Sequence, residues 1–122
     1  MKFLMMIKSN EKYRAEGPPP ALMEAMGKFV QEGFQSGQLV DTGGLKPSSA
    51  ATRFRIQKGK LTVTDGPFTE SKEVVGGWAI VKVKTRAEAM EISRKFMELH
   101  TQHWPTFEAT SEVFEMEEYE AP

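Results

Sequence analysis

Residues 78–99, WAIVKVKTRAEAMEISRKFMEL, join an apolar strand to an amphipathic helix. Between Trp78 and Val83 apolar side chains occupy both odd and even positions, so they point to both faces of a strand. This is typical of a strand that is covered on both faces. Residues 85–88, Thr-Arg-Ala-Glu, match a capping box, in which the Thr and Glu side chains bind free backbone N–H groups at a helix start. Apolar residues then recur at spacings of three and four: Ala89, Ile92, Phe96 and Leu99. This stretch therefore predicts a strand followed by an α-helix.

The N-terminal part of the chain repeats this order. Phe3 to Ile7 is a second run with apolar residues on both faces of a strand. A one-sided apolar stripe predicts a helix from Pro18 to Gly37, because proline suits a first helical turn and glycine a helix end. The stripe consists of Leu22, Met26, Phe29, Val30 and Phe34. The polar residues 10–17 are predicted to form a loop.

Three further segments have the pattern of strands. A short strand is predicted to begin at Leu39 and to run into the two glycines that follow. Residues 52–56 and 61–64 alternate in polarity on either side of a Lys58-Gly59 turn, which indicates a β-hairpin with one polar face. Residues 107–116 predict a final strand.

The predicted order is strand, helix, strand, hairpin, strand, helix, strand, which is the α+β arrangement of a ferredoxin-like fold. Two helices cover only one face of its antiparallel sheet, whereas two of its strands have apolar residues on both faces. We therefore predict that the sheet of an identical chain covers the second face, which makes the protein a homodimer. The residues expected to be inaccessible to water are Met5, Phe29, Phe34, Phe54, Ile80, Ile92 and Phe96.

Composition limits the classes of protein to consider. A length of 122 residues suits one domain, expected to span 1–122. The formal charge of -1 provides no field that attracts nucleic acid or anionic lipid, so neither is expected as a partner. The absence of cysteine excludes disulfides and thiolate catalysis and fits a reducing compartment. Because the first apolar run, residues 3–7, is too short for a signal-peptide core or a membrane span, we expect a cytoplasmic protein.

Residues 65–73, Asp-Gly-Pro-Phe-Thr-Glu-Ser-Lys-Glu, are more elaborate than a simple connection between strands requires. A Gly-Pro turn precedes a cluster of charges, and Gly76-Gly77 follows at the predicted mouth of the next strand, where backbone must bend or approach another group closely. The segment resembles the motif of the YCII-related proteins, in the branch named for Asp-Gly-Pro-Phe with a following Glu-x-Lys-Glu. The resemblance covers nearly the whole chain, including residues 43–48 and 112–115.

This resemblance implies a dimeric α+β barrel in a bacterial protein, and it implies no single activity. Members of the branch often occur beside, or fused to, extracytoplasmic-function sigma factors. The wider fold group includes muconolactone isomerase-like enzymes, small monooxygenases and ligand-binding domains, so the fold does not choose among them. A related branch is thought to pair a His on the first helix with an Asp for acid–base chemistry. Residues 18–37 contain no His, so that pair is not carried over.

The candidate catalytic residues are Asp65, His100 and His103. Burial beside a cavity would raise the pKa of Asp65 toward a value useful for proton transfer, whereas an Asp at a turn commonly just accepts backbone N–H bonds. The two histidines are the groups whose ordinary pKa lies near neutrality, yet a cationic His also stabilises a helix C-terminus without any catalytic role. Spaced three apart with no third ligand nearby, they make a weak metal pair, and no metal or cofactor is expected.

The candidate ligand-binding residues are Glu70, Lys72 and Arg55. Glu70 and Lys72 share a face if their segment is extended, and a buried pair there would bind a polar ligand or fix a loop of the dimer. An exposed ion-pair cluster is the alternative. Arg53 and Arg55 alternate along one face of the hairpin and have the geometry to clamp a carboxylate, although solvated strand arginines are commoner.

Two functions follow from these residues. The first is a homodimer that binds a small polar or aromatic molecule near residues 65–72, with cofactor-free proton transfer of the isomerase or lyase type as its chemistry. The second is a non-catalytic regulatory or interaction protein, associated with an extracytoplasmic-function sigma factor, in which the motif only builds the dimer. An ionisable group in a concave site would favour the first, and an exposed apolar patch outside the dimer interface would favour the second.

Overall fold

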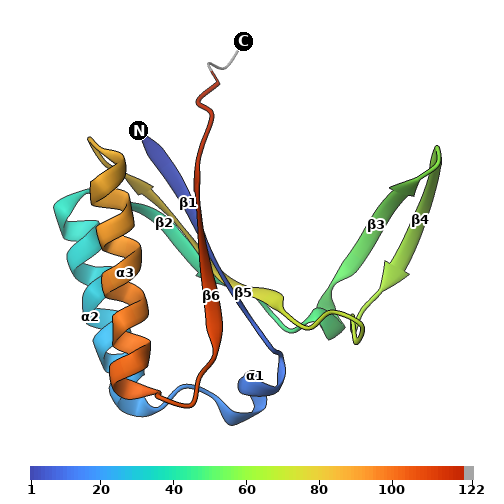
Figure 1. Cartoon of the computed structure of the whole chain (residues 1–122), viewed down its shortest axis with the longest axis horizontal. Coiled ribbons are helices and arrows are strands. Elements are labelled where there is room, and N and C mark those ends of the chain that lie inside the picture. The colour runs from blue at the N-terminus through green and yellow to red at the C-terminus, as the bar shows by residue number, and fades with distance from the viewer. Residues whose placement is uncertain (120–122) are drawn as a thin grey trace.

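A computed structural model describes residues 1–119 as an antiparallel sheet with two long helices on one face and a separate hairpin (Figure 1). In chain order the elements are β1 (Lys2–Ser9), α1 (Lys12–Glu16), α2 (Pro20–Ser36), β2 (Leu39–Gly44), the 3₁₀ turn η1 (Ser48–Ala50), β3 (Thr52–Gln57), β4 (Lys60–Asp65), β5 (Val74–Lys82), α3 (Arg86–His103) and β6 (Ala109–Glu115). The sheet has the strand order β2-β5-β1-β6, and β3 and β4 pair only with each other. This arrangement confirms the ferredoxin-like α+β prediction.

Strand β1 lies at the centre of the molecule and pairs antiparallel with β5 and β6. Its residues Phe3 and Met5 face the helices, opposite Val81 and Ala79 of β5. Phe3 and Val81 are almost completely buried, and they form the core together with Met5, Val83 and Ala89 of α3. The helix-covered face of the sheet is therefore the hydrophobic core.

The opposite face of the sheet is apolar as well. Leu4 lies between Ile80 and Phe114 on the neighbouring strands, and Met6 lies opposite Trp78. Leu4, Met6 and Ile80 are half-buried, and Phe114 is 48% exposed. Both long helices lie on the other side of the sheet (Figure 1), so no helix among residues 1–119 covers the second apolar face.

Helix α3 begins where the capping pattern predicts. The Thr85 side chain accepts a hydrogen bond from the Glu88 backbone N–H at 3.2 Å. The Glu88 carboxylate in turn accepts from the Lys84 backbone N–H at 3.1 Å, so both side chains bind backbone groups that the helix leaves free. Helix α2 ends at Gly37, whose positive φ of 80° is favourable for glycine.

Two predicted boundaries are wrong. Residues 10–17 are not a plain loop, because they contain the short helix α1, whose polar turn has no apolar stripe to reveal it. Strand β5 begins at Val74 rather than at Trp78, so Gly76 and Gly77 lie inside the strand. The pairing with β1 shifts register there, since Ile7 lies opposite Gly77 and Lys8 opposite Val75, and this irregularity accounts for the glycines.

The prediction of the core is partly wrong. Met5 is buried, while Phe29, Ile80, Ile92 and Phe96 are half-buried. Phe34 is 48% exposed because Gly33 faces the sheet at this turn of α2: a Cβ on Gly33 would lie 3.0 Å from the Cβ of Leu39. Phe54 is 68% exposed because its hairpin stands clear of the sheet.

Candidate functional site

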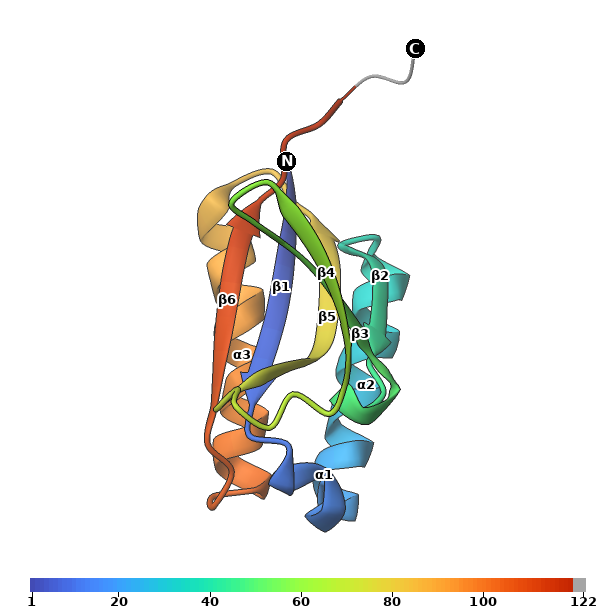
Figure 2. The same ribbon diagram turned by 90° about the vertical axis from the view of Figure 1, so that its right-hand side faces the viewer.

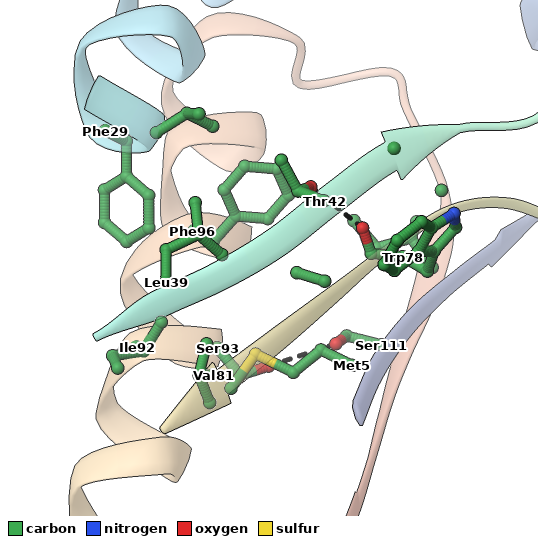
Figure 3. A pocket seen from close by; sticks show the side chains of 15 residues that line it. Met5, Phe29, Leu39, Thr42, Trp78, Val81, Ile92, Ser93, Phe96 and Ser111 are labelled. Atoms are coloured by element: carbon green, nitrogen blue, oxygen red, sulfur yellow. Dashed lines mark hydrogen bonds between the residues drawn. The ribbon is translucent and has the colours of Figure 1, made fainter. Parts of the chain in front are cut away.

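A small apolar cavity lies between α2, α3 and the helix-covered face of the sheet (Figure 3). Its volume is about 130 Å³. The side chains that dominate its wall are apolar and come from three strands and both long helices: Met5, Phe29, Leu39, Val81, Ile92 and Phe96. An apolar cavity of about 150 Å³ is large enough to hold benzene, so this one suits a single small ring.

The hydroxyl groups in this wall are already paired. The Thr42 hydroxyl donates to the backbone oxygen of Trp78 at 2.8 Å. The hydroxyls of Ser93 and Ser111 are hydrogen-bonded to each other at 3.0 Å, which joins α3 to β6 across the cavity. Within residues 1–119, no Asp, Glu, Lys, Arg or His side chain lines the wall. The site is therefore suited to an apolar molecule with at most a weakly polar edge.

His100 lies one turn beyond Phe96 on α3 and is only 8% exposed. Its ring packs edge-on to Phe96 at 5.1 Å between centroids and is stacked on Phe107 at 5.5 Å. Nδ1 lies 3.0 Å from the Phe96 carbonyl oxygen, which can only accept, so Nδ1 carries the hydrogen. Burial lowers the pKa of His100 below its ordinary value, and this hydrogen bond opposes the shift only in part. His100 thus packs among aromatic rings near the end of α3, whereas His103 is half-buried at the last position of that helix.

The Asp-Gly-Pro-Phe segment lies at the base of the hairpin. Asp65 is exposed and accepts a hydrogen bond from the Thr52 hydroxyl at 2.9 Å, which ties together the two ends of the hairpin. The Gly66 backbone N–H donates to the Ala51 oxygen at 2.8 Å. A Cβ on Gly66 would lie 1.7 Å from the Ser48 backbone oxygen, so the close backbone contact at this position requires glycine.

Arg53 of β3 binds the second half of the motif. Its guanidinium carbon lies 4.0 Å from the centre of the Phe68 ring, a cation–π contact. The same guanidinium forms an ion pair with Glu70, and this contact holds the pKa of Glu70 below its ordinary value. Arg53 therefore pairs with a carboxylate of its own chain. Arg55 is exposed, and its role in binding a ligand stays a prediction.

Ser48 joins the motif to the N-terminal part of the chain. Its hydroxyl accepts from the Phe68 backbone N–H at 3.0 Å and donates to a Glu11 carboxylate oxygen at 2.8 Å. The Ser48 backbone N–H donates to the other Glu11 oxygen at 2.6 Å. These hydrogen bonds lower the pKa of Glu11. The hairpin base is thus held to the segment that follows β1.

Lys72 points to a different part of the surface. It is exposed and borders a polar hollow of about 310 Å³ together with Lys12, Tyr13, Glu73 and Glu108. Asp65 is bound to Thr52 and Glu70 to Arg53, so the three predicted charges have separate neighbours.

A model of the YCII-related domain matches residues 1–101. The chain belongs to the YCII-related family. It is also 33% identical over 73 residues to "Uncharacterized protein R00369" of Rhizobium meliloti (strain 1021), a match that covers 60% of this chain. The chain spans about three fifths of the length of that relative, 59%.

Sequence reasoning about this YCII-related domain missed the cavity and the two side chains that anchor the motif, Glu11 and Ser48. Four residues of the cavity wall, Met5, Phe29, Ile92 and Phe96, are predicted as core from the sequence, and an apolar pattern does not show where a core is incompletely filled. Across residues 1–119, no three His, Asp or Glu residues gather closely enough to hold a metal ion. No helix in that same part of the YCII-related chain has the length and hydropathy needed to span a bilayer.

Proposed function

We propose that this YCII-related protein is a homodimer that binds a small apolar, ring-sized molecule in the cavity between α2, α3 and the sheet. The observation that carries the proposal is the cavity itself: about 130 Å³ of space with an apolar wall in the middle of the fold. A well-packed core leaves few spaces larger than one water molecule, and a well-formed apolar pocket is the first place to expect a small-molecule site.

Binding has more support than proton transfer. In the described part of the chain the wall carries hydroxyl groups but no charged group, and His100 lies behind Phe96 with its Nδ1 hydrogen donated to a backbone oxygen. Binding at the motif also has less support, because Gly66, Phe68 and Glu70 use their polar and aromatic groups on contacts within the chain. We infer that the motif positions the hairpin.

The same proposal includes the finer family assignment. Asp65 to Phe68 together with Glu70, Lys72 and Glu73 supports membership of the Asp-Gly-Pro-Phe branch, and with it a bacterial origin. The cysteine-free composition supports a cytoplasmic location.

A second function, interaction with another protein such as an extracytoplasmic-function sigma factor, is favoured by one observation. The hairpin presents large apolar side chains to solvent, including Phe54 at 68% and Ile56 at 78% exposure. Exposed apolar patches of this kind mark interaction sites. If a different protein covers the hairpin, this second function is supported. If a second copy of the chain covers it, the first function is supported.

The test of the first function uses benzene and indole as probes. Ala79 lies in the cavity wall, so Ala79→Leu should fill the space, whereas Ala87→Leu adds the same bulk at an exposed position of α3. Thermal shift and saturation-transfer NMR should show binding of at least one probe to the parent and to Ala87→Leu. Ala79→Leu should bind it at least tenfold more weakly. Failure of both probes to bind the parent, or equal binding to all three proteins, would contradict the proposal.

A further inference from the structure

The hairpin formed by β3 and β4, which we term the arm (residues 52–65), has one strongly apolar face. Phe54 lies opposite Val63 and Ile56 lies opposite Leu61, so the four side chains are on the same side of the hairpin. Their exposures are 68% for Phe54, 58% for Val63, 78% for Ile56 and 62% for Leu61. A two-stranded hairpin with a bare apolar face is marginal in water by itself, so this face requires a cover.

The arm is held away from its own sheet. The contact of Gly66 with Ser48 and the contact of Phe68 with Arg53 fix its base. From that base the arm and the sheet diverge in Figure 1, and in Figure 2 the arm lies in front of the uncovered face of the sheet. Folding the arm back onto its own sheet would break the contacts of the motif. The cover must therefore come from another molecule.

The uncovered face of the sheet has the matching chemistry. Leu4, Met6, Ile80 and Phe114 form an apolar surface on β1, β5 and β6 that is half-buried or exposed. The same chain thus has two apolar surfaces that none of the described residues covers, one on the arm and one on the sheet. Two copies related by a two-fold axis can satisfy both at once.

The charges of the two regions are also complementary. The outer part of the arm carries exposed Arg55, Lys58 and Lys60. Strand β6 and the residues after it carry exposed Glu115, Glu117 and Glu118. With a formal net charge of -1, the chain as a whole repels a second copy little, while its arm and its last strand attract each other. This complementarity favours a second copy over an unrelated protein.

We propose that the arm of each chain packs its apolar face on the uncovered sheet face of a second copy, with the basic arm tip beside the partner's acidic β6. The inference rests on the homodimer of the proposed function and assigns its contact surfaces. Because the exchange is reciprocal, each chain buries large side chains from both its arm and its sheet. A stable interface covers about 1,600 Å² in total, and the reciprocal exchange uses both apolar surfaces of each chain toward that area. The Asp-Gly-Pro-Phe motif then acts as the fixed joint that presents the arm to the partner.

Sedimentation equilibrium tests the arm with a matched pair of variants. Ile56→Asp places a charge on the apolar face, whereas Thr62→Asp places it on the polar face of the same hairpin. At about 20 μM the parent and Thr62→Asp should sediment at twice the chain mass of 13.7 kDa, and Ile56→Asp should sediment as a monomer with parent-like circular dichroism. A dimeric Ile56→Asp would overturn the arm contact while the homodimer stands. A monomeric parent would overturn both and leave the arm to a different protein.

Cross-linking identifies the surface that receives the arm, and it remains informative if Ile56→Asp unfolds. Because the chain has no cysteine, Phe54→Cys in a tagged chain and Leu4→Cys in an untagged chain each introduce a single thiol. Incubating the two chains together with bismaleimidoethane should give the mixed dimer, and replacing Phe54→Cys by Thr62→Cys should reduce its yield at least fivefold. Equal yields from the two arm positions, or cross-links between two Leu4→Cys chains alone, would show that the sheets meet without the arms.

Discussion

Gly66 is the position of the motif that least tolerates a side chain. Its missing side chain lets the backbone approach Ser48 so closely that a Cβ would overlap the carbonyl oxygen. The same approach aligns the Gly66 N–H with the Ala51 oxygen and the Phe68 N–H with the Ser48 hydroxyl. A single glycine therefore decides whether the base of the arm can form.

We predict that Gly66→Ala lowers the free energy of unfolding by about 1–3 kcal/mol, the usual cost of overpacking. The reason is that the neighbouring atom is backbone and cannot rotate away. Urea denaturation with each variant measures the change. Gly27→Ala is the matched control, because a Cβ on Gly27 of α2 would meet nothing within 4 Å.

The control should stabilise the protein by about 0.5–1 kcal/mol, since alanine is the better helix former. If Gly66→Ala is as stable as the parent, the base of the arm is not as tightly packed as the Ser48 contact requires.

At the scale of elements, α3 shows how tertiary contacts modify a rule of local structure. Its N-terminus follows the local pattern, with Thr85 and Glu88 as the cap. Its C-terminus carries His100 in the last turn, where the helix dipole favours the cation. The surrounding aromatic rings instead bury the imidazole, and burial lowers its pKa. Desolvation outweighs the dipole at this position.

This shift predicts a dependence of stability on pH. Since the folded-state pKa of His100 is below the unfolded value of about 6.5, the unfolded chain binds more protons once the pH falls below that value. The stabilising contribution of His100 to the free energy of unfolding is thus fully present above about pH 6.5 and is lost as the pH falls. The urea midpoint of the parent should decrease from pH 7.5 to pH 5.5.

His100→Gln should flatten that decrease. His103→Gln, three residues further along α3, should leave it in place. Urea denaturation of the three proteins at both pH values makes the comparison. An equal decrease in the parent and in His100→Gln would place the titrating group elsewhere.

At the scale of the whole molecule, the fold places a basic region and an acidic region on different parts of the chain. The basic residues of the arm and the acidic residues of β6 lie on parts of one chain that diverge in Figure 1. If these regions meet between copies, charge attraction adds to apolar burial in the dimer. Attraction between exposed charges weakens as salt screens it, whereas apolar burial does not.

We predict that the dimer dissociates several-fold more readily at 0.5 M than at 0.05 M NaCl, and that Lys58→Glu weakens it at low salt. Analytical ultracentrifugation across a concentration series measures both effects. Lys28→Glu makes the same charge change at an exposed position on α2 and should leave the dissociation constant unchanged. Equal weakening by the two variants would mean that only net charge matters.

The order and type of the main elements could be predicted from the sequence, because periodicity, caps and turn residues act over a few neighbouring positions. The apolar pattern on both faces of β1 and β5 was equally visible. The pattern did not show which of the two sheet faces the helices of the same chain would cover. For the same reason Phe54 was wrongly expected in the core.

The candidate site depended on the tertiary structure. Ser48 binds Glu11 across 37 positions of the chain, and Arg53 binds Glu70 across 17. No local rule relates residues so far apart. The cavity exists because α2 and α3 meet the sheet without filling the space between them, which depends on side-chain volumes from six elements at once. The sequence by itself determined the elements and their two apolar surfaces, and only the packing of those elements decided which surface is core, where space remains, and that the motif holds an arm.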